Sequence, residues 1–322
     1  MTIPSILLAL SVVSCSKRSD NSMPVQASSQ DTLNSWSKIV VTRNTPIIDI
    51  WFTSASKGFF ISGNGFIYQS NDGGASWDSI PGSKSPGIPL NLFFQSPQYG
   101  FAEGPSYLQI TRDGGQTWST KSLETGTAYN ITFLSPSTGF YNDISMGLYK
   151  TTDTGNTWVN VYHDPTGHSN GYYSYFFNDN KGFEITGDGV VAETYDGGST
   201  WIQKATGLIA QPFNVPIFNV MQFVDSLTGY FACNRGLYKT GDGGSTWNVI
   251  FPKGGLLNLV KFFDSNNAYY LSDSTIYKTT DGGQTWKVDC HLGEDSFLGM
   301  SFINSTTGWA CTYKGYVLKL SE

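Results

Sequence analysis

Six aspartates stand at the head of a six-residue motif, Asp-Gly/Thr-Gly-x-Ser/Thr-Trp, that recurs along the chain every 39 to 46 residues. Its Asp and Trp pairs are Asp72 and Trp77, Asp113 and Trp118, Asp153 and Trp158, Asp196 and Trp201, Asp242 and Trp247, and Asp281 and Trp286. Carboxylates repeated in this way suggest either a ring for metal binding or catalysis, or side chains that hold their own turns. We favour the second interpretation, because Asp accepts local backbone N–H groups, Gly supplies a positive φ, and a Ser or Thr hydroxyl adds a further bond. Each Trp is expected to bury its ring between sheets, with its N–H needing a partner.

The three histidines could form a second kind of chemical site. His163 and His168 lie five residues apart in a loop containing Gly and Pro, and His291 lies far away in the chain. Together with Asp164, Glu294 and Asp295 they suggest a metal site or an acid–base pair, whereas solvated loop histidines are the simpler alternative. We prefer the simpler alternative and predict neither a metal nor a cofactor.

The composition limits the class of protein. Charged residues make up 14% of the 322 residues, where about 25% is usual, while aromatic residues reach 15% and there are 36 glycines. These values are typical of an all-β chain rich in turns. The formal net charge of -6 argues against a nucleic-acid-binding protein, which needs a basic surface to neutralise phosphates.

A repeat of about 40 residues is typical of a β-propeller, in which each repeat forms a four-stranded blade. A second marker, a Phe followed six residues later by Gly or Ala and then an aromatic residue, occurs seven times. Its copies are Phe52/Gly58/Phe59, Phe94/Gly100/Phe101, Phe133/Gly139/Phe140, Phe176/Gly182/Phe183, Phe223/Gly229/Tyr230, Phe262/Ala268/Tyr269 and Phe302/Gly308/Trp309. The chain therefore has seven of these markers but only six Asp motifs.

The two ends of the chain account for the difference. Residues 296–320 supply three strands, and the missing fourth strand is expected at 37–41, directly after Asp31-Thr32-Leu33-Asn34-Ser35-Trp36. We therefore predict a single domain over residues 31–322, an all-β, seven-bladed propeller of four-stranded antiparallel blades. Its last blade is closed by the N-terminal strand, which removes two free sheet edges.

The Asp motif resembles the BNR or Asp-box repeat. In Asp-box propellers the motif lies between the third and fourth strands of a blade, on the face opposite the ligand site. The resemblance thus implies that ligands bind at the turns between second and third strands, which include Arg235, and at the loops joining blades. The binding residues expected in these loops are Arg43, His163, Asp164, His168, His291, Glu294 and Asp295. These loops are 43–45, 81–88, 121–127, 162–170, 205–214, 251–255 and 289–296.

Sialidases share this repeat and clamp the carboxylate of their substrate with three arginines. Only Arg43, Arg112 and Arg235 follow residue 30, and Arg112 lies within an Asp motif on the other face, so that triad cannot be assembled. Another type of glycoside hydrolase, with two carboxylates drawn from residues such as Asp143, Asp188 and Asp273, is the alternative function.

Over most of its length the chain is similar to the photosystem II stability/assembly factor type of propeller. Tyr238-Lys239-Thr240 and Tyr277-Lys278-Thr279-Thr280, each directly before an Asp motif, carry this resemblance most clearly. It implies a non-catalytic binding or assembly scaffold, although the arginine-rich patch of photosynthetic members has no counterpart here. A protein or a glycan is the expected partner, and exposed aromatics such as Tyr172, Tyr173, Phe213 and Phe251 would favour a glycan; burial of these side chains is the alternative.

The N-terminus predicts export to the cell envelope. An apolar run from Ile3 to Val13 is too short to span a bilayer and is typical of a signal peptide over residues 1–14. Val12-Val13-Ser14-Cys15 resembles the bacterial lipobox, which implies acylation of Cys15 and a lipidated flexible tether over residues 15–30. The predicted protein is a monomeric, membrane-anchored lipoprotein on the periplasmic side of a membrane or at the cell surface.

Three further cysteines follow Cys15. A disulfide between Cys290 and Cys311 and a set of unpaired thiols that includes Cys233 are the two alternatives.

Overall fold

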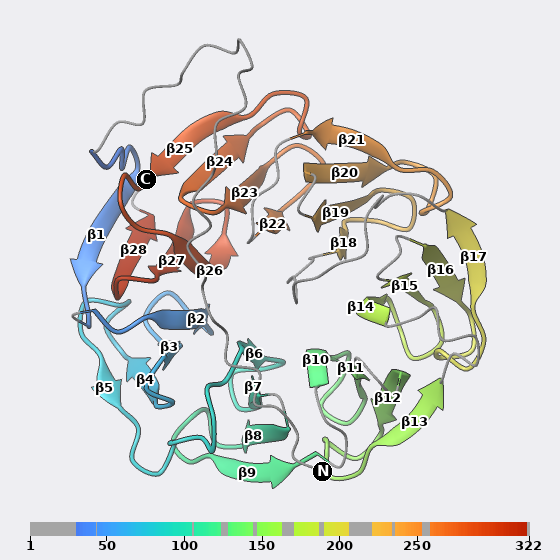
Figure 1. The fold of residues 1–322 in the computed structure, drawn as a ribbon, viewed down its shortest axis with the longest axis horizontal. Coiled ribbons are helices and arrows are strands. Elements are labelled where there is room, and N and C mark those ends of the chain that lie inside the picture. The colour runs from blue at the N-terminus through green and yellow to red at the C-terminus, as the bar shows by residue number, and fades with distance from the viewer. Residues whose placement is uncertain are drawn as a thin grey trace, which may run out of the picture.

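The computed structural model describes residues 30–42, 44–104, 106–123, 128–143, 147–162, 171–186, 190–205, 221–233, 236–252 and 258–320. All the regular elements in these ranges are β-strands, and they form seven four-stranded antiparallel sheets. The sheets stand around a central axis as the blades of a propeller (Figure 1). No helix long and apolar enough to cross a bilayer occurs in these ranges.

The blades follow one another in chain order, each from its inner to its outer strand. Blade 1 consists of β2 (Ile47–Phe52), β3 (Gly58–Ser62), β4 (Ile67–Ser70) and β5 (Asp78–Ser79), and blade 2 of β6 (Asn91–Phe94), β7 (Gly100–Gly104), β8 (Tyr107–Thr111) and β9 (Ser119–Ser122). Blade 3 consists of β10 (Ala128–Phe133), β11 (Gly139–Asp143), β12 (Gly147–Thr151) and β13 (Val159–Tyr162), and blade 4 of β14 (Gly171–Phe176), β15 (Gly182–Thr186), β16 (Val191–Thr194) and β17 (Ile202–Ala205). Blade 5 consists of β18 (Met221–Phe223), β19 (Gly229–Cys233), β20 (Gly236–Thr240) and β21 (Asn248–Phe251), and blade 6 of β22 (Asn258–Phe262), β23 (Ala268–Ser272), β24 (Thr275–Thr279) and β25 (Lys287–His291).

Blade 7 joins the two ends of the chain, as predicted. Its sheet has the order β1-β28-β27-β26, with β26 (Phe297–Asn304), β27 (Thr307–Thr312), β28 (Tyr316–Leu320) and the N-terminal strand β1 (Trp36–Val40) outermost. The strands β1 and β28 pair over five residues, from Trp36 opposite Leu320 to Val40 opposite Tyr316. Figure 1 shows β1 on the rim beside β28, where it completes the ring.

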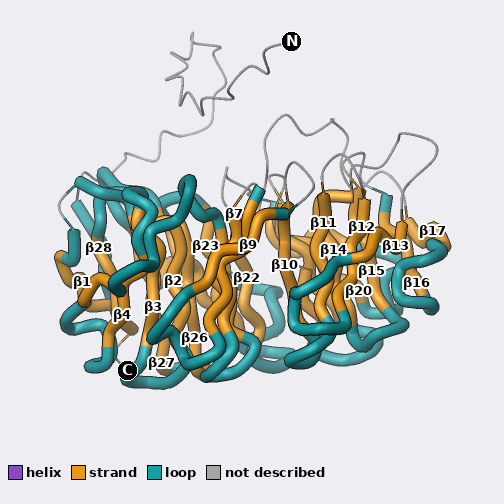
Figure 2. Tube along the Cα trace, turned by 90° about the horizontal axis from the view of Figure 1, so that it is seen from below, coloured by secondary structure: helices purple, strands orange, loops and turns teal. Residues whose placement is uncertain are grey.

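Because the blades are antiparallel, the propeller has two distinct faces (Figure 2). One face carries the six Asp motifs and the turns between first and second strands, and we call it the Asp-turn face. The other face carries the turns between second and third strands and the segments that join blades, and we call it the blade-joining face.

The seven copies of the second marker form the contacts between blades. The second aromatic ring of each marker stacks on the first Phe of the next blade, with ring centroids 3.3 to 4.9 Å apart. The pairs are Phe59–Phe94, Phe101–Phe133, Phe140–Phe176, Phe183–Phe223, Tyr230–Phe262, Tyr269–Phe302 and Trp309–Phe52. Each such pair adds about 0.5–1.5 kcal/mol to the free energy gained by burying the rings.

The Gly of the marker leaves room for the Phe that precedes it. A Cβ atom at Gly58 would lie 2.5 Å from the ring of Phe52, well inside van der Waals contact. The spacing of Phe and Gly in the marker therefore has a steric origin.

The Trp of each Asp motif completes the contact. Its ring packs edge-on against the first Phe of its own blade in all seven blades, with Trp36 taking this place in blade 7. Each seam between blades thus holds a Phe between a stacked ring from one blade and a perpendicular Trp from its own.

Candidate functional site

The six Asp motifs form nearly identical turns, which we call the Asp-turns. In the second of them Asp113 accepts hydrogen bonds from the backbone N–H of Thr117 at 3.0 Å, from its hydroxyl at 2.5 Å and from the hydroxyl of Thr111 at 2.8 Å. The same three bonds occur at Asp72, Asp153, Asp196, Asp242 and Asp281. These contacts are the ones expected of carboxylates that hold their own turns.

The hydrogen bonds hold the carboxylates ionised. The Thr117 hydroxyl, followed by the Thr117 N–H, lowers the pKa of Asp113 from 3.8 to about 2. Bonds from Ser76 do the same for Asp72, whose pKa also falls to about 2. Since their oxygens already accept bonds from the turn, these carboxylates have little capacity left for a metal or a substrate. The described ranges hold no cluster of three His, Cys, Asp or Glu residues that could bind a metal ion.

The Trp of most Asp-turns finds its hydrogen-bond partner inside the turn. The indole N–H of Trp77, Trp118, Trp201, Trp247 and Trp286 donates to the carbonyl of the second Gly of its own motif at 3.0 to 3.2 Å. The buried indole N–H of Trp158 has no partner within the described part of the chain, and the Lys121 ammonium donates to the corresponding carbonyl, that of Gly155. A lysine from the neighbouring blade has therefore replaced the indole at this turn.

The incomplete seventh motif folds differently. Asp31 accepts from the Lys38 ammonium at 2.8 Å and from the Gly293 N–H at 3.1 Å, and the indole N–H of Trp36 donates to Asp289 at 2.7 Å. Thr32 exchanges two backbone hydrogen bonds with His291 of blade 6. The Asp and Trp keep the offsets of the motif, but their partners come from blade 6 and from β1, so this segment fastens blade 7 to blade 6.

The residues predicted to bind a ligand were expected on the blade-joining face. Of these, His291, Glu294 and Asp295 lie in the described ranges. The other predicted residues, namely Arg43, His163, Asp164, His168 and Arg235, lie outside them, as do Asp188 and Phe213.

His291 is held by blade 6 and by the N-terminal segment. Its Nδ1 atom lies 2.9 Å from the hydroxyl of Thr275, and its backbone is paired with Thr32. His291 is therefore the last residue of β25, partly buried and hydrogen-bonded, and not a solvated loop histidine as expected.

Asp295 and Glu294 are adjacent in the chain but lie in different environments. Asp295 is buried, and its Oδ1 atom accepts from the backbone N–H groups of Ser296 at 2.8 Å and Lys314 at 3.0 Å. Glu294 is 76% exposed, with the Lys314 ammonium 3.8 Å away. Asp295 therefore positions the turn at Lys314, and of these two carboxylates only Glu294 is available to a partner.

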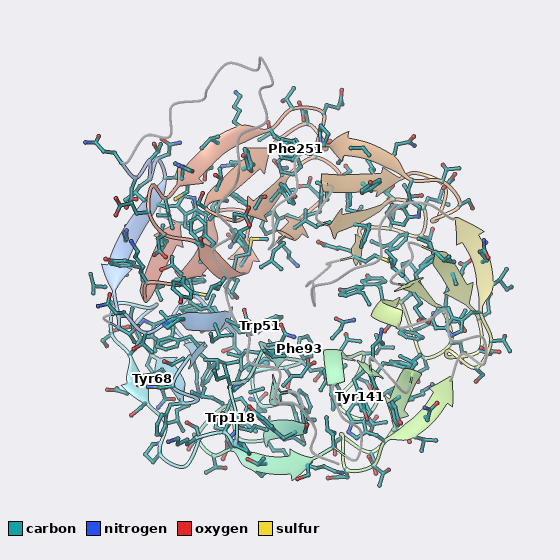
Figure 3. All side chains as sticks on the ribbon, viewed as in Figure 1. Trp51, Tyr68, Phe93, Trp118, Tyr141 and Phe251 are labelled. Carbon is teal, nitrogen blue, oxygen red and sulfur yellow. The ribbon has the colours of Figure 1, made fainter. Side chains whose placement is uncertain are left out.

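Two aromatic residues considered as glycan platforms are packed into the fold instead. Phe251 contacts Tyr270, Tyr277 and Trp286, and Figure 3 shows it among the strands of blades 5 and 6. The hydroxyl of Tyr173 donates to the carbonyl of Met221 in blade 5. The side chain of Tyr172 lies outside the described ranges.

Sequence reasoning missed two carboxylates at the seams between blades, Asp49, which is partly buried, and Glu103, which is 2% exposed. Asp49 accepts from the backbone N–H groups of Ile50 and Leu92, each at 2.8 Å, and Glu103 accepts from that of Ile131 at 3.1 Å. Leu92 and Ile131 each belong to the following blade, so both carboxylates tie one blade to the next. Burial raises the pKa of each group to about 7. The signal in the sequence was an acidic residue inside an otherwise apolar strand.

These carboxylates do not resemble the pair of a glycoside hydrolase. Asp143, one of the candidates for such a pair, is 1% exposed, and Asp273 lies in a turn with a φ of 49°. Asp49 is partly buried and Glu103 is buried, and both accept hydrogen bonds from backbone groups. The described carboxylates therefore do not favour hydrolysis.

Cys290 and Cys311 are both free and fully buried, so the disulfide between them is not formed. Burial raises the pKa of the Cys290 thiol to about 12 and that of Cys311 well above its usual value, which leaves both thiols inert. The side chain of Cys233 lies outside the described ranges.

The fold is a seven-bladed propeller, and its repeated carboxylates hold their own turns. Both features are typical of the class of propellers that act as binding scaffolds. A family model described as photosynthesis system II assembly factor YCF48 matches residues 28–171 and 169–290. The chain belongs to this family, which is one of assembly factors rather than enzymes.

The chain is similar to three known proteins of this family. The photosystem II assembly lipoprotein Ycf48 of Synechococcus sp. (strain CC9902) is 30% identical over 130 residues, which span 38% of this chain and only 39% of that relative. The solved structure of YCF48 bound to D1 peptide has a TM-score of 0.69 at 18% identity and covers 90% of this chain and 98% of that one. YCF48 from Cyanidioschyzon merolae has a TM-score of 0.69 at 17% identity, covering 89% and 99%. At these identities the two structures establish the shared fold.

Proposed function

We propose that this chain is a non-catalytic assembly factor that holds a segment of a protein partner on its blade-joining face. Its membership of an assembly-factor family carries the proposal. The YCF48 structure with a bound D1 peptide supports a peptide-like partner for a propeller of this kind.

The chemistry of the two faces supports the choice of face. On the Asp-turn face, the carboxylates accept hydrogen bonds from their own turns. On the blade-joining face, Glu294 and Lys314 are exposed, and Tyr313 and Ile88 expose 48% and 53% of their surface. Exposed aromatic and apolar side chains beside charged ones are typical of a protein-binding surface.

The N-terminal segment also supports this orientation. Asp31 and Thr32 are fastened to Gly293 and His291, at the end of β25 on the blade-joining face. If Cys15 carries a lipid, the anchor joins the propeller at this face, and residues 15–29 reach at most about 50 Å when extended. The blade-joining face would then lie toward the membrane, and a membrane protein in the cell envelope is the partner we propose.

A crosslinking experiment tests the proposal. A photoreactive amino acid replaces Glu294 or Tyr313 on the blade-joining face, and Ala75 or Ser245, both exposed on the Asp-turn face, in matched controls. Illumination of native membranes should crosslink the first two variants, and not the controls, to the same membrane protein. Crosslinks from the controls alone would overturn the choice of face, and specific binding on a glycan array without any protein crosslink would replace the protein partner by a glycan.

A further inference from the structure

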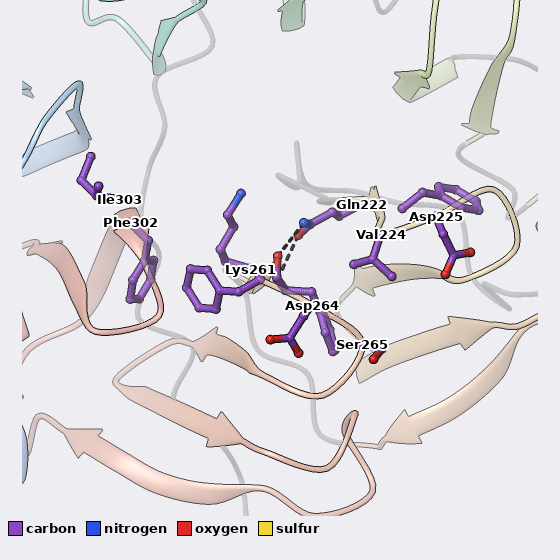
Figure 4. A pocket seen from close by; sticks show the side chains of 11 residues that line it. Gln222, Val224, Asp225, Lys261, Asp264, Ser265, Phe302 and Ile303 are labelled. Carbon is purple, nitrogen blue, oxygen red and sulfur yellow. Dashed lines mark hydrogen bonds between the residues drawn. The ribbon is translucent and has the colours of Figure 1, made fainter.

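A pocket of about 690 Å³ opens on the Asp-turn face, opposite the face discussed above. It lies where the inner strands of blades 5, 6 and 7 end, and Gln222, Lys261, Phe263, Phe302 and Ile303 are among its lining residues. Its volume is within the range of about 300–1,000 Å³ that is usual for small-molecule sites. Figure 4 shows Lys261 extending between Gln222 and Phe302.

The residue before the first Phe of each marker usually bridges to the next blade. The Tyr175 hydroxyl bonds to the backbone of Phe223, and the Gln222 amide bonds to both the N–H and the carbonyl of Phe262 at 3.0 and 2.8 Å. The hydroxyl of Ser301 accepts from the N–H of Phe52 at 2.9 Å. In blade 1 the bridge is aromatic, since Trp51 packs edge-on against Phe93, as Figure 3 shows near the axis.

Lys261 occupies this position in blade 6 and makes no such bridge. No hydrogen bond or ion pair of its ammonium is found among the described residues. It is the only basic residue on the seven inner strands as far as they are described. Although the side chain is exposed to the pocket, the surrounding protein desolvates it and lowers the pKa of the ammonium.

Two carboxylates on the pocket wall limit the charge of a ligand. Asp225 accepts from the N–H groups of Leu227 and Thr228, and Asp264 from those of Asn266 and Asn267. The backbone bonds lower the pKa of Asp225. The side-chain amide of Asn267, followed by the two backbone N–H groups, lowers the pKa of Asp264, so both carboxyl groups are ionised at neutral pH. They repel a dianion such as phosphate more strongly than a monoanion, so a ligand with a single negative charge placed on the Lys261 ammonium is favoured over a dianion.

We propose that this pocket binds a small organic monocarboxylate, with the carboxylate at Lys261 and an apolar body against Phe263, Phe302 and Ile303. Phe263 and Phe302 already contact each other at 5.4 Å between ring centroids and offer an aromatic wall. Ile303 is 41% exposed beside them. This site is separate from the partner surface on the blade-joining face, and either proposal can fail without the other.

Titration calorimetry on the full-length protein with 3-phenylpropionate as the probe tests the site. The wild type should bind it saturably, and Lys261→Gln should weaken binding at least tenfold. Gln is the residue found at the equivalent position of blade 5, so this variant should fold normally, as circular dichroism can verify. Lys287→Gln removes an exposed lysine of the same blade and should bind like the wild type.

Three further ligands determine what is recognised. The neutral 3-phenylpropanamide and inorganic phosphate should each bind at least tenfold more weakly than the acid. A blocked tripeptide with a central Glu between two Phe residues distinguishes a free acid from a carboxylate presented by a polypeptide, and binding of either supports the site. The absence of saturable binding of both up to about 10 mM overturns the proposal. Unchanged binding by Lys261→Gln, or equal binding of the amide or phosphate, also overturns it.

Discussion

At the scale of single residues, the same carboxyl group takes opposite roles according to its surroundings. In the Asp-turns it lies at the surface and accepts three local hydrogen bonds, so its pKa falls to about 2 in Asp113, which is partly exposed. In Glu103 it is buried, one oxygen accepts bonds while Oε1 has no partner among the described residues, and its pKa rises to about 7. The acidic residues of this chain therefore affect stability in opposite directions as the pH changes.

Replacing Asp113 by Ala should destabilise the protein by about 1–2 kcal/mol, because the bonds from Thr111 and Thr117 are lost together. Urea denaturation at pH 7 measures this change. Since the pKa of Asp113 is depressed in the folded state, the stabilisation is present above pH 4 and is lost as the pH falls toward 2. The difference between wild type and variant should shrink over that interval.

Asp78→Ala is the matched control, since Asp78 is exposed in the outer strand directly after the first Asp-turn. It should change the free energy of unfolding by less than about 0.5 kcal/mol. Equal effects of the two substitutions would show that the bonds of the Asp-turn contribute nothing.

Glu103 should make the protein less stable as the pH rises. Its pKa is 4.5 in the unfolded chain and about 7 in the folded one, so the folded state binds more protons between these values. The free energy of unfolding should therefore fall from pH 5 to pH 7 and level off above pH 8. Glu103→Gln should lose the contribution of Glu103 to this dependence, while that of Asp49 remains, and should exceed the wild type by about 1–3 kcal/mol at pH 8.

Urea denaturation at pH 5, 6, 7 and 8 measures this effect, with Glu294→Gln as the exposed control. If Glu103→Gln keeps the slope of the wild type, Glu103 is ionised in the folded state throughout this range.

At the scale of elements, the first thirteen described residues connect two blades. Strand β1 pairs with β28 of blade 7, while Asp31, Thr32 and Asn34 bond to blade 6. Trp36 is 4% exposed and packs against Tyr269 of blade 6 and Phe302 of blade 7. The segment thus takes the place of both an outer strand and an Asp-turn.

Deleting residues 31–43 should open or unfold the ring, because it removes β1 and the buried Trp36, whose loss alone costs about 3–5 kcal/mol. The melting temperature measures this loss. A synthetic peptide of residues 30–43, added in excess, should restore it in part by pairing with β28, and the same peptide with Trp36→Ala should not. An unchanged melting temperature in the deletion variant would show that the closure contributes no stability.

At the scale of the whole molecule, the lipid anchor predicted at Cys15 would hold the propeller at a membrane. Cys15→Ser should move the protein from the membrane to the soluble fraction, because it removes acyl chains that each contribute about 0.8 kcal/mol per buried CH2 group. Fractionation and the mass of the mature N-terminus measure this change, with Cys233→Ser as a control. An unmodified Cys15 in the mature wild type would contradict the lipoprotein prediction.

The sequence by itself determined the number of blades, the strand that closes the ring and the structural role of the Asp-turns. These features follow from local chemistry: a turn of six residues contains nearly all its own hydrogen-bond partners, and a marker repeated seven times implies seven identical seams. The same local patterns also indicated the family to which the chain belongs.

Only the tertiary structure decided which polar groups meet across the seams. Asp49 finds its partner in Leu92, 43 positions later, and Lys261 lacks the bridge that Gln222 makes. The side chains of Glu294 and Asp295 are neighbours with the same chemistry, yet one is exposed and the other is buried beneath a turn of blade 7. Such differences depend on the packing of distant segments, and no spacing along the chain encodes them.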